Sequence, residues 1–302
     1  MSNEFGSKLQ EQTIGVRLTT CALGCRRTMS KGQLIQVADL FEADERSVSG
    51  SKAIINNKHE LIKPIHSVLS DAKSYIRART IDYPEQGLRL CRVDQIDALT
   101  EGIKHRQEHL AELVDNLCAN WASVISEAQK RLDKLFDETD YPTSPKVHYA
   151  IYLGFPEIKP DQRLMQLNPQ LYAEQQAIIA AKFEEAVIVA EAAAAQELQK
   201  LLSNLVEKLR PDADGTKKIL KCSTVANIGE FVELFKAKTI KSNDGLEALM
   251  AKVQAMAGGL DADDLRKATA ADREAVSLEL QAVLQEVTGL ISTMPIRSID
   301  LE

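Results

Sequence analysis

The sequence is poor in aromatic side chains, which make up 5% of its 302 residues and include a single tryptophan. Proteins that bind single-stranded nucleic acid without sequence preference stack bases on exposed rings, so this composition argues against that class. There is no run of about 18 apolar residues, and we therefore expect no membrane-spanning helix. Residues 1–6 lack the basic and apolar regions of a secretory leader, so no leader is expected either.

Cysteine is also scarce. The chain has five cysteines, an odd number spread over a long sequence, which is typical of reduced thiols rather than of a disulfide framework. We therefore expect a cytoplasmic protein. The five residues are Cys21, Cys25, Cys91, Cys118 and Cys222.

Positive charge is in the minority, with 37 Lys and Arg against 44 Asp and Glu and a net charge of −7. This balance argues against a protein whose whole surface binds a polyanion. Residues 1–92, however, carry 14 basic and 10 acidic side chains, a local net charge of +4 (14 − 10). Contacts to nucleic-acid phosphates would be expected from this region. The candidate contacts are Arg17, Arg26, Arg27, Lys31, Arg77 and Arg79.

The sequence is rich in helical periodicity. Two long amphipathic stretches, residues 94–137 and 168–209, would each form a rod of roughly 60 Å at about 1.5 Å per residue. In the first stretch, five apolar positions seven residues apart indicate a seam against another long helix. Arg106 and Asn120 interrupt the companion row, so a strict coiled coil is not expected. The seam residues are Ile96, Ile103, Leu110, Leu117 and Val124.

The ends of the long stretches carry helix-start signals. Asp94 is expected to cap the first helix by accepting backbone N–H bonds. Asn168 is expected to cap the second, because Pro169 follows at the first helical position, where a missing N–H costs nothing. The apolar stripe predicted for the second helix begins with Leu171 and Ile178.

Alternating side chains predict strands at 13–21, 88–92 and 147–153. The expected fold is α+β and predominantly α: a long antiparallel helical hairpin with a small β-sheet at one end and a C-terminal helical bundle. The expected division is a mixed α/β region at 1–92, the hairpin with an inserted strand (146–153) at 93–210, and C-terminal helices at 211–302. Further helices are predicted at 33–41, 58–79, 226–238, 244–257 and 271–294.

Three short motifs resemble sites that carry chemistry. His59 and His66 are seven residues apart, too far to chelate one zinc ion from a single helix, so ordinary helix histidines are expected. Cys21 and Cys25 lie in a basic stretch that favours thiolate, but no second ligand pair is visible, so we expect buried or idle thiols. The sequence Ser49-Gly50-Ser51-Lys52 lacks the first glycine of a phosphate-binding loop, and an ordinary loop is expected. No catalytic, cofactor or metal residues are predicted, which favours a non-enzymatic protein.

A strand-like opening, a loop with Gly50-Ser51-Lys52, a long helix with Trp121 near its middle and Tyr141-Pro142 before a strand follow one another in this chain. This order resembles a bacterial and phage family classed as a domain of unknown function. Members are often encoded beside MoxR-type AAA+ ATPases and von Willebrand A-domain proteins on phages and conjugative elements. The resemblance covers roughly residues 13–160. It departs at Cys21-Ala22-Leu23, where the family's opening strand carries a tryptophan, and it brings no catalytic residues.

Two functional hypotheses follow. The first is a helical interaction or adaptor protein of a phage or mobile element, with an AAA+ ATPase as the partner that the resemblance implies. The alternative is a DNA-binding accessory factor for recombination or replication, which rests on the basic N-terminal region. A membrane-acting bundle is disfavoured, because the polar helix faces are acidic rather than rich in Lys and Arg. The seam residues leave homo-oligomerisation open.

Overall fold

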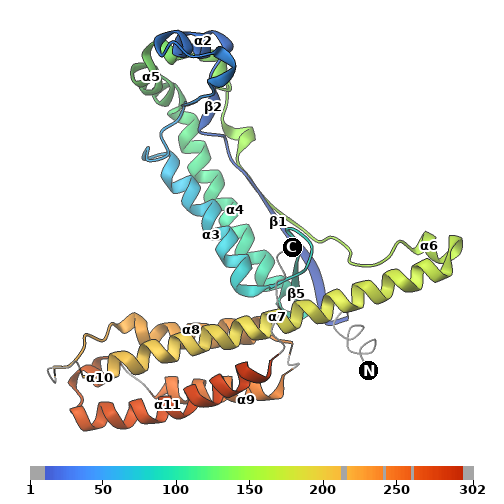
Figure 1. Cartoon of the computed structure of the whole chain (residues 1–302), viewed down its shortest axis with the longest axis vertical. Coiled ribbons are helices and arrows are strands. Elements are labelled where there is room, and N and C mark those ends of the chain that lie inside the picture. The colour runs from blue at the N-terminus through green and yellow to red at the C-terminus, as the bar shows by residue number, and fades with distance from the viewer. Residues whose placement is uncertain (1–10, 212–215, 241–242, 260–261, 295–302) are drawn as a thin grey trace. The chain divides into compact units, whose positions relative to one another are not determined.

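The computed structural model describes residues 11–211, 216–240, 243–259 and 262–294 (Figure 1). It is 69% helical with a small antiparallel sheet of four strands, which confirms the predicted α+β, predominantly α class. Residues 1–6, on which the expectation of no leader rests, lie outside the described residues.

The chain forms two compact units, each assembled from separated stretches of sequence. The first unit comprises Met1–Val16, Arg77–Ile96 and Phe155–Glu302, and the second comprises Arg17–Ile76 and Asp97–Gly154. The predicted division used three consecutive segments instead. That division followed the order of the helices along the chain, whereas compact units are defined by tertiary contacts.

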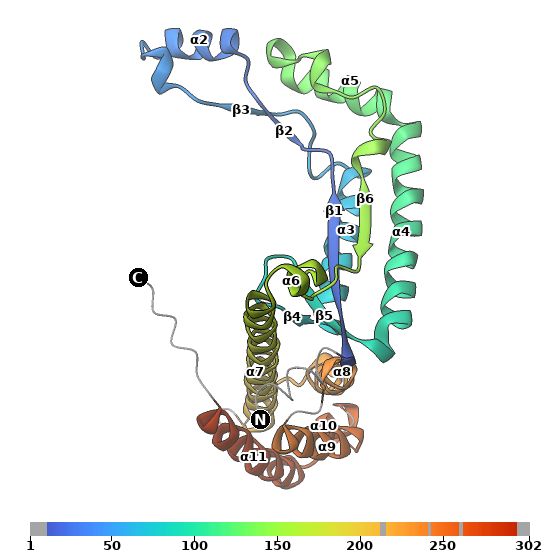
Figure 2. The same cartoon turned by 90° about the vertical axis from the view of Figure 1, so that its right-hand side faces the viewer.

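The second unit is built on two antiparallel helices that lie side by side, α3 (Ile62–Arg79) and α4 (Ile96–Ala119) (Figures 1 and 2). After a break at Asn120 the chain continues as α5 (Trp121–Leu132). Pro64 falls in the first turn of α3, where its ring does not disrupt the helix. The smaller elements of this unit are β2 (Arg26–Thr28), α2 (Lys31–Leu40), β3 (Ser51–Ala53) and β6 (Ala150–Gly154).

The core of the second unit lies between α3 and α4. Four of the five predicted seam positions are at most 4% exposed, and they pack with the apolar face of α3, which includes Ile65 and Leu69. The seven-residue spacing thus identified a buried face. The fifth position, Ile96, is half-buried at the beginning of α4. The four buried residues are Ile103, Leu110, Leu117 and Val124.

The first unit is built on one helix of 41 residues, α7 (Pro169–Leu209). It packs along α11 (Ala270–Thr293) and α8 (Cys222–Lys238), and together they bury a leucine-rich core. The predicted start is confirmed, because Asn168 Oδ1 accepts a hydrogen bond of 3.1 Å from the Leu171 backbone N–H. The remaining elements are β4 (Ile81–Asp82), β5 (Arg89–Arg92), α6 (Gln162–Leu167), α9 (Asp244–Gly258) and α10 (Ala262–Lys267).

The sheet has the order β4-β5-β1-β6, with every pair antiparallel. Strand β1 (Thr13–Cys21) matches its predicted bounds. In the first unit, its opening residues pair with β5, in the register Ile14 to Cys91. In the second unit, its later residues pair with β6, in the register Thr20 to Ile151.

Two details of the first predicted helix are wrong. The helix over 94–137 is interrupted at Asn120, whose side-chain amide donates a 2.8 Å hydrogen bond to the Asn116 carbonyl, beside the 3.3 Å bond from its own backbone N–H. Asp94 does not cap it, because its carboxylate binds the Arg92 guanidinium, with Nε to Oδ1 at 2.9 Å. The helix begins at Ile96 after a 3-10 turn.

Three further details differ from the predictions. The two long helices were predicted to form a hairpin with each other. Instead, α4 packs with α3 in the second unit, and α7 packs with α11 in the first. Residues Lys146–His148 were predicted to belong to a strand but form a 3-10 turn. The strand itself, β6, begins only at Ala150. Residues Ser51–Ala53, expected in a loop, form β3 and pair with β2.

Candidate functional site

His59 and His66, the two histidines of the predicted helix, contact different residues. The His59 imidazole has Nε2 3.4 Å from the Glu127 carboxylate, while His66 Nε2 lies 3.8 Å from the sulfur of Cys25. Among the described residues, no three His, Cys, Asp or Glu side chains are grouped so that they could hold a metal ion.

Cys25 and His66 form a contact that the sequence did not indicate, because 41 residues separate them. Burial raises the pKa of the Cys25 thiol, which keeps the sulfur protonated and makes it a weak nucleophile. Burial also raises the pKa of Tyr149, whose hydroxyl is buried without a hydrogen-bond partner among the described residues. The other cysteine of the predicted pair, Cys21, is exposed at the end of β1. The surroundings of Cys25 therefore indicate a packed thiol and not a reactive one.

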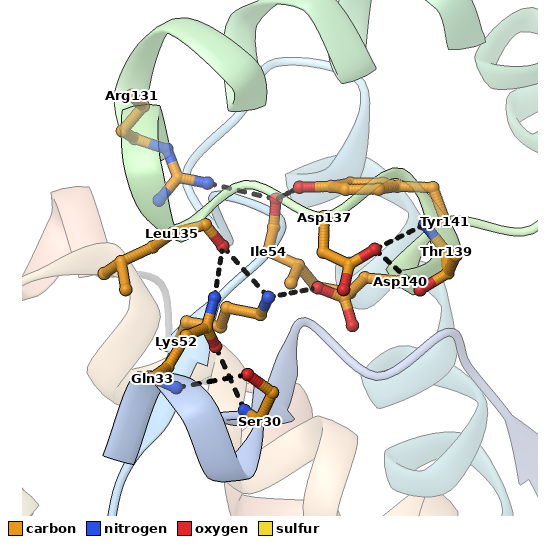
Figure 3. Close-up of polar contacts among 10 residues, drawn as sticks. All are labelled: Ser30, Gln33, Lys52, Ile54, Arg131, Leu135, Asp137, Thr139, Asp140 and Tyr141. Atoms are coloured by element: carbon orange, nitrogen blue, oxygen red, sulfur yellow. Dashed lines mark hydrogen bonds and ion pairs between the residues drawn. The ribbon is translucent and has the colours of Figure 1, made fainter. Parts of the chain in front are cut away.

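Lys52, the lysine of the loop motif, is buried and fully engaged (Figure 3). Its ammonium nitrogen lies 2.7 Å from the Asp140 carboxylate and donates a 2.9 Å hydrogen bond to the Leu135 carbonyl. Gln33 of α2 donates to the same carbonyl at 3.3 Å. Because the ammonium already neutralises a carboxylate, Lys52 is not available to bind a phosphate group.

A second set of contacts beside Lys52 converges on one backbone carbonyl (Figure 3). The Ile54 oxygen accepts hydrogen bonds from the Arg131 guanidinium at 3.1 Å and from the Tyr141 hydroxyl at 2.9 Å. Burial raises the pKa of Tyr141, so its hydroxyl stays a donor. These contacts fasten the end of α5 and the following turns to the β2–β3 hairpin. We interpret the whole cluster as structural.

The six predicted nucleic-acid contacts divide between the two units. Arg17, Arg26, Arg27 and Lys31 belong to the second unit, and Arg77 and Arg79 to the first. The Arg26 guanidinium is held by Ser51, with Nε to Oγ at 3.0 Å. Three of the residues follow one another closely, on β2 and at the start of α2. Their role in nucleic-acid binding stays a prediction.

The most unusual surface of the first unit is formed by α6 and the first four turns of α7, residues 162–182, which we call the apolar arm. All of these residues are described, and none is buried; the first buried residue of α7 is Phe183. Leu171 and Ile178, predicted to lie in a buried stripe, are 37% and 46% exposed. The correction has a simple reason: periodicity identifies an apolar face but not what covers it.

The apolar arm is also depleted of charge. Over residues 164–181 Glu174 is the only charged side chain, in a chain of which 27% is charged. Figure 1 shows α6 at the beginning of α7, away from the part of α7 that packs with α8 and α11. The other exposed large apolar residues of the arm are Met165 and Leu167. A surface of this composition is suited to bind another apolar surface.

Comparisons of the chain with protein-family models, with curated proteins and with solved structures found no match in any of the three. In the described part of the chain, no helix has both the length and the apolar character needed to cross a membrane. The functional evidence therefore lies in the chain's own surfaces.

Proposed function

We propose that the chain is a non-enzymatic helical interaction protein of a phage or other mobile genetic element, which binds a partner protein through the apolar arm. The observation that carries this proposal is that residues 164–181 include no buried residue and are almost free of charge. The centres of protein interfaces are depleted of charged residues in the same way. Covering apolar surface contributes about 25 cal/mol per Å², so a protein that covers the arm would be bound with a favourable free energy.

The arm has the spacing of a helix that binds in a groove. Leu171 and Ile178 are seven residues apart, so they lie on one face of α7, two turns from each other. The occupant we propose is a partner protein with an apolar groove, rather than a charged one, because Glu174 is the only charged side chain over residues 164–181.

The family resemblance makes a MoxR-type AAA+ ATPase the first partner to test. A substrate or adaptor of such an ATPase would act in the cytoplasm, which agrees with the odd and scattered cysteines. DNA binding by the basic residues remains the alternative, and a gel shift with single- and double-stranded DNA at low salt tests it directly.

The test compares two double variants of α7. Leu171→Asp with Ile178→Asp places two charges on the proposed interface, whereas Ala173→Asp with Gln176→Asp places two charges on the opposite, exposed side of the same turns. A photo-crosslinking residue at position 178, with one at 176 as control, identifies the bound protein in the host. The partner is then purified and its affinity for each variant measured.

We expect one partner protein to crosslink from position 178 and to bind the control variant as it binds the wild type. The interface variant should bind at least about tenfold more weakly, a difference of about 1.4 kcal/mol. Equal affinities for the two variants, or crosslinks only to a second copy of this chain, would contradict the proposal. The second outcome would make the arm a homo-oligomer interface.

A further inference from the structure

A cavity of about 360 Å³ lies in the first unit, between the end of α3, strands β4 and β5, and helices α7 and α8. This volume is within the range of small-molecule sites, roughly 300–1,000 Å³. Three cationic side chains and two carboxylates line it, so the lining carries one excess positive charge (3 − 2) in a chain whose net charge is −7. These residues are Arg77, Arg89, Lys238, Asp82 and Glu197. We call this space the cationic cavity.

The guanidinium of Arg89 is held in place by hydrogen bonds at the wall of the cavity. Its Nε donates to the Thr80 hydroxyl at 2.5 Å, one terminal nitrogen donates to the Thr80 carbonyl at 3.1 Å, and the other pairs with the Asp82 carboxylate. The Arg89 side chain is 13% exposed, whereas that of Asp82 is 79% exposed. The partly buried guanidinium is thus only partly compensated, because its partner carboxylate faces water.

Lys238, in the last turn of α8, is a cation without a direct partner. The side chain is half-buried, and its ammonium makes no hydrogen bond or ion pair with any described residue. Burial lowers the pKa of Lys238 most, and the positive charge of Arg89 lowers it further, while Asp82 and Glu197 act in the opposite direction. Arg77, at the end of α3, is exposed, and its guanidinium likewise contacts no described side chain. Two donor groups therefore remain for a ligand.

The rest of the cavity wall is apolar. Along α7 the wall is made by small residues, including Ala186, Ala190 and Ala193, which leave room beside the helix. Along α8 it is made by larger ones, including Phe231 and Leu234. A ligand in this cavity would meet cations at one end and an aliphatic and aromatic surface along its side.

We propose that the cationic cavity binds a small organic anion. Its phosphate or carboxylate group is held by Lys238 and Arg77, and its apolar or aromatic body lies against α7 and α8. Charge-assisted hydrogen bonds from Lys and Arg are the usual recognition of such groups. The two lining carboxylates limit the site to a ligand of low charge. This site is separate from the apolar arm and does not depend on the proposed partner binding.

Titration calorimetry on the full chain tests the site with three probes. Inorganic phosphate supplies the anionic group alone, benzoate a carboxylate on an aromatic body, and adenosine monophosphate a phosphate on a larger body. The variants are Lys238→Met and Arg77→Gln, with Lys236→Met as control, because Lys236 is on the same helix but pairs with Glu233 outside the cavity. Lys238→Arg keeps the charge and should retain binding.

We expect at least one organic probe to bind saturably and about tenfold or more tightly than inorganic phosphate, because the apolar wall adds to its affinity. Lys238→Met and Arg77→Gln should each weaken that binding about tenfold or more, and Lys236→Met should leave it unchanged. The proposal is overturned if no probe binds saturably, if phosphate binds as tightly as both organic probes, or if Lys238→Met binds like the wild type.

A second measurement, without ligand, tests whether the Lys238 ammonium lacks a partner or forms an ion pair with Glu197 in solution. Removing a half-buried charge that lacks a partner relieves its desolvation, so Lys238→Met should raise the melting temperature of the free protein or leave it unchanged. A lowered melting temperature, restored by Lys238→Arg, would mean that Lys238 pairs with Glu197 in solution, and the proposed anion site would then be wrong.

Discussion

The ammonium of Lys52 lies 2.7 Å from the carboxylate of Asp140, and the two side chains are 2% and 15% exposed. The pair joins β3 to the 3-10 turn Glu138–Asp140. A buried ion pair contributes little net stability, since desolvation offsets the attraction, but the loss of one partner leaves a buried charge uncompensated. A single substitution in this pair should therefore destabilise the protein much more than replacement of both residues by apolar ones.

Asp140→Asn should therefore lower the free energy of unfolding by about 3 kcal/mol, whereas Lys52→Met combined with Asp140→Leu should change it much less. The measurement is urea unfolding followed by the fluorescence of Trp121, the only tryptophan in the chain and a buried residue of the second unit.

The matched control for the buried pair is Asp115→Asn. Asp115 pairs with Lys146 at 2.6 Å, but both side chains are more than half exposed, so its loss should cost less than about 1 kcal/mol. Equal destabilisation by Asp140→Asn and Asp115→Asn would show that Lys52 is solvated.

Gly102→Ala should destabilise the second unit, although alanine favours helices by up to about 1 kcal/mol over glycine. An added Cβ would lie 2.0 Å from the hydroxyl oxygen of Tyr75. That ring is held in place, because its hydroxyl donates to the Ala98 carbonyl at 3.0 Å and the Arg106 guanidinium lies 3.8 Å from its centroid. We expect a loss of about 1–3 kcal/mol by urea unfolding.

The contrasting variant is Gly289→Ala in α11. An added Cβ there meets nothing within 4 Å, so the same substitution should stabilise the protein by about 0.5–1 kcal/mol. A stabilising effect at both positions would mean that Tyr75 moves aside without loss.

The register of α7 can be tested with two neighbouring leucines. Leu202 is fully buried in the first unit, whereas Leu201 is only partly buried at the edge of the same core. Leu202→Asp should prevent folding of the first unit, and Leu201→Asp should cost clearly less, as measured by the melting temperature from circular dichroism. A larger effect at Leu201 would show that the helix is rotated by about 100° from its position here.

Stability should fall at alkaline pH because of Cys91. Burial, and to a lesser extent the negative charge of Asp94, raise the pKa of this thiol from 9.0 to about 11 in the folded protein. Between these values the unfolded chain loses a proton that the folded chain retains, so the free energy of unfolding decreases as the pH rises. The loss should reach about 2 kcal/mol by pH 11.

The control for the alkaline effect is Cys91→Ala, which removes the thiol from the pair that it forms with Ile14 in the sheet. The variant should be less stable at neutral pH but should lack the additional loss above pH 9. An identical alkaline slope in wild type and variant would assign the effect to other groups, such as Tyr83, whose pKa burial raises to about 12.

Local chemistry in the sequence predicted the beginning of α7. Asn168 and Pro169 act through hydrogen bonds and backbone angles within four residues, and the structure confirms them. The interruption at Asn120 is also a local effect, but asparagine occurs in many uninterrupted helices. Its presence in the periodic pattern therefore did not indicate where the helix would break.

The contacts that decide the sites are not local, and they could not be predicted in the same way. Cys25 meets His66 across 41 residues, and Lys52 meets the Leu135 carbonyl across 83. No spacing rule connects such positions. Strands of three residues, such as β2 and β3, are likewise too short for an alternating pattern to reveal them.

The part of α7 that packs in the core of the first unit makes it easier for the first turns of the helix to form. A helix as short as residues 169–182 would be marginal in water on its own, because the first hydrogen-bonded turn must be nucleated at a high entropic cost. From Phe183 to Leu209 the helix is held by the core of the first unit, so that nucleus already exists. Residues 169–182 need only add turns to it, one hydrogen bond per residue. A protein that binds the apolar arm would therefore meet a helix that is largely preorganised, and little of the binding free energy would be spent on ordering it.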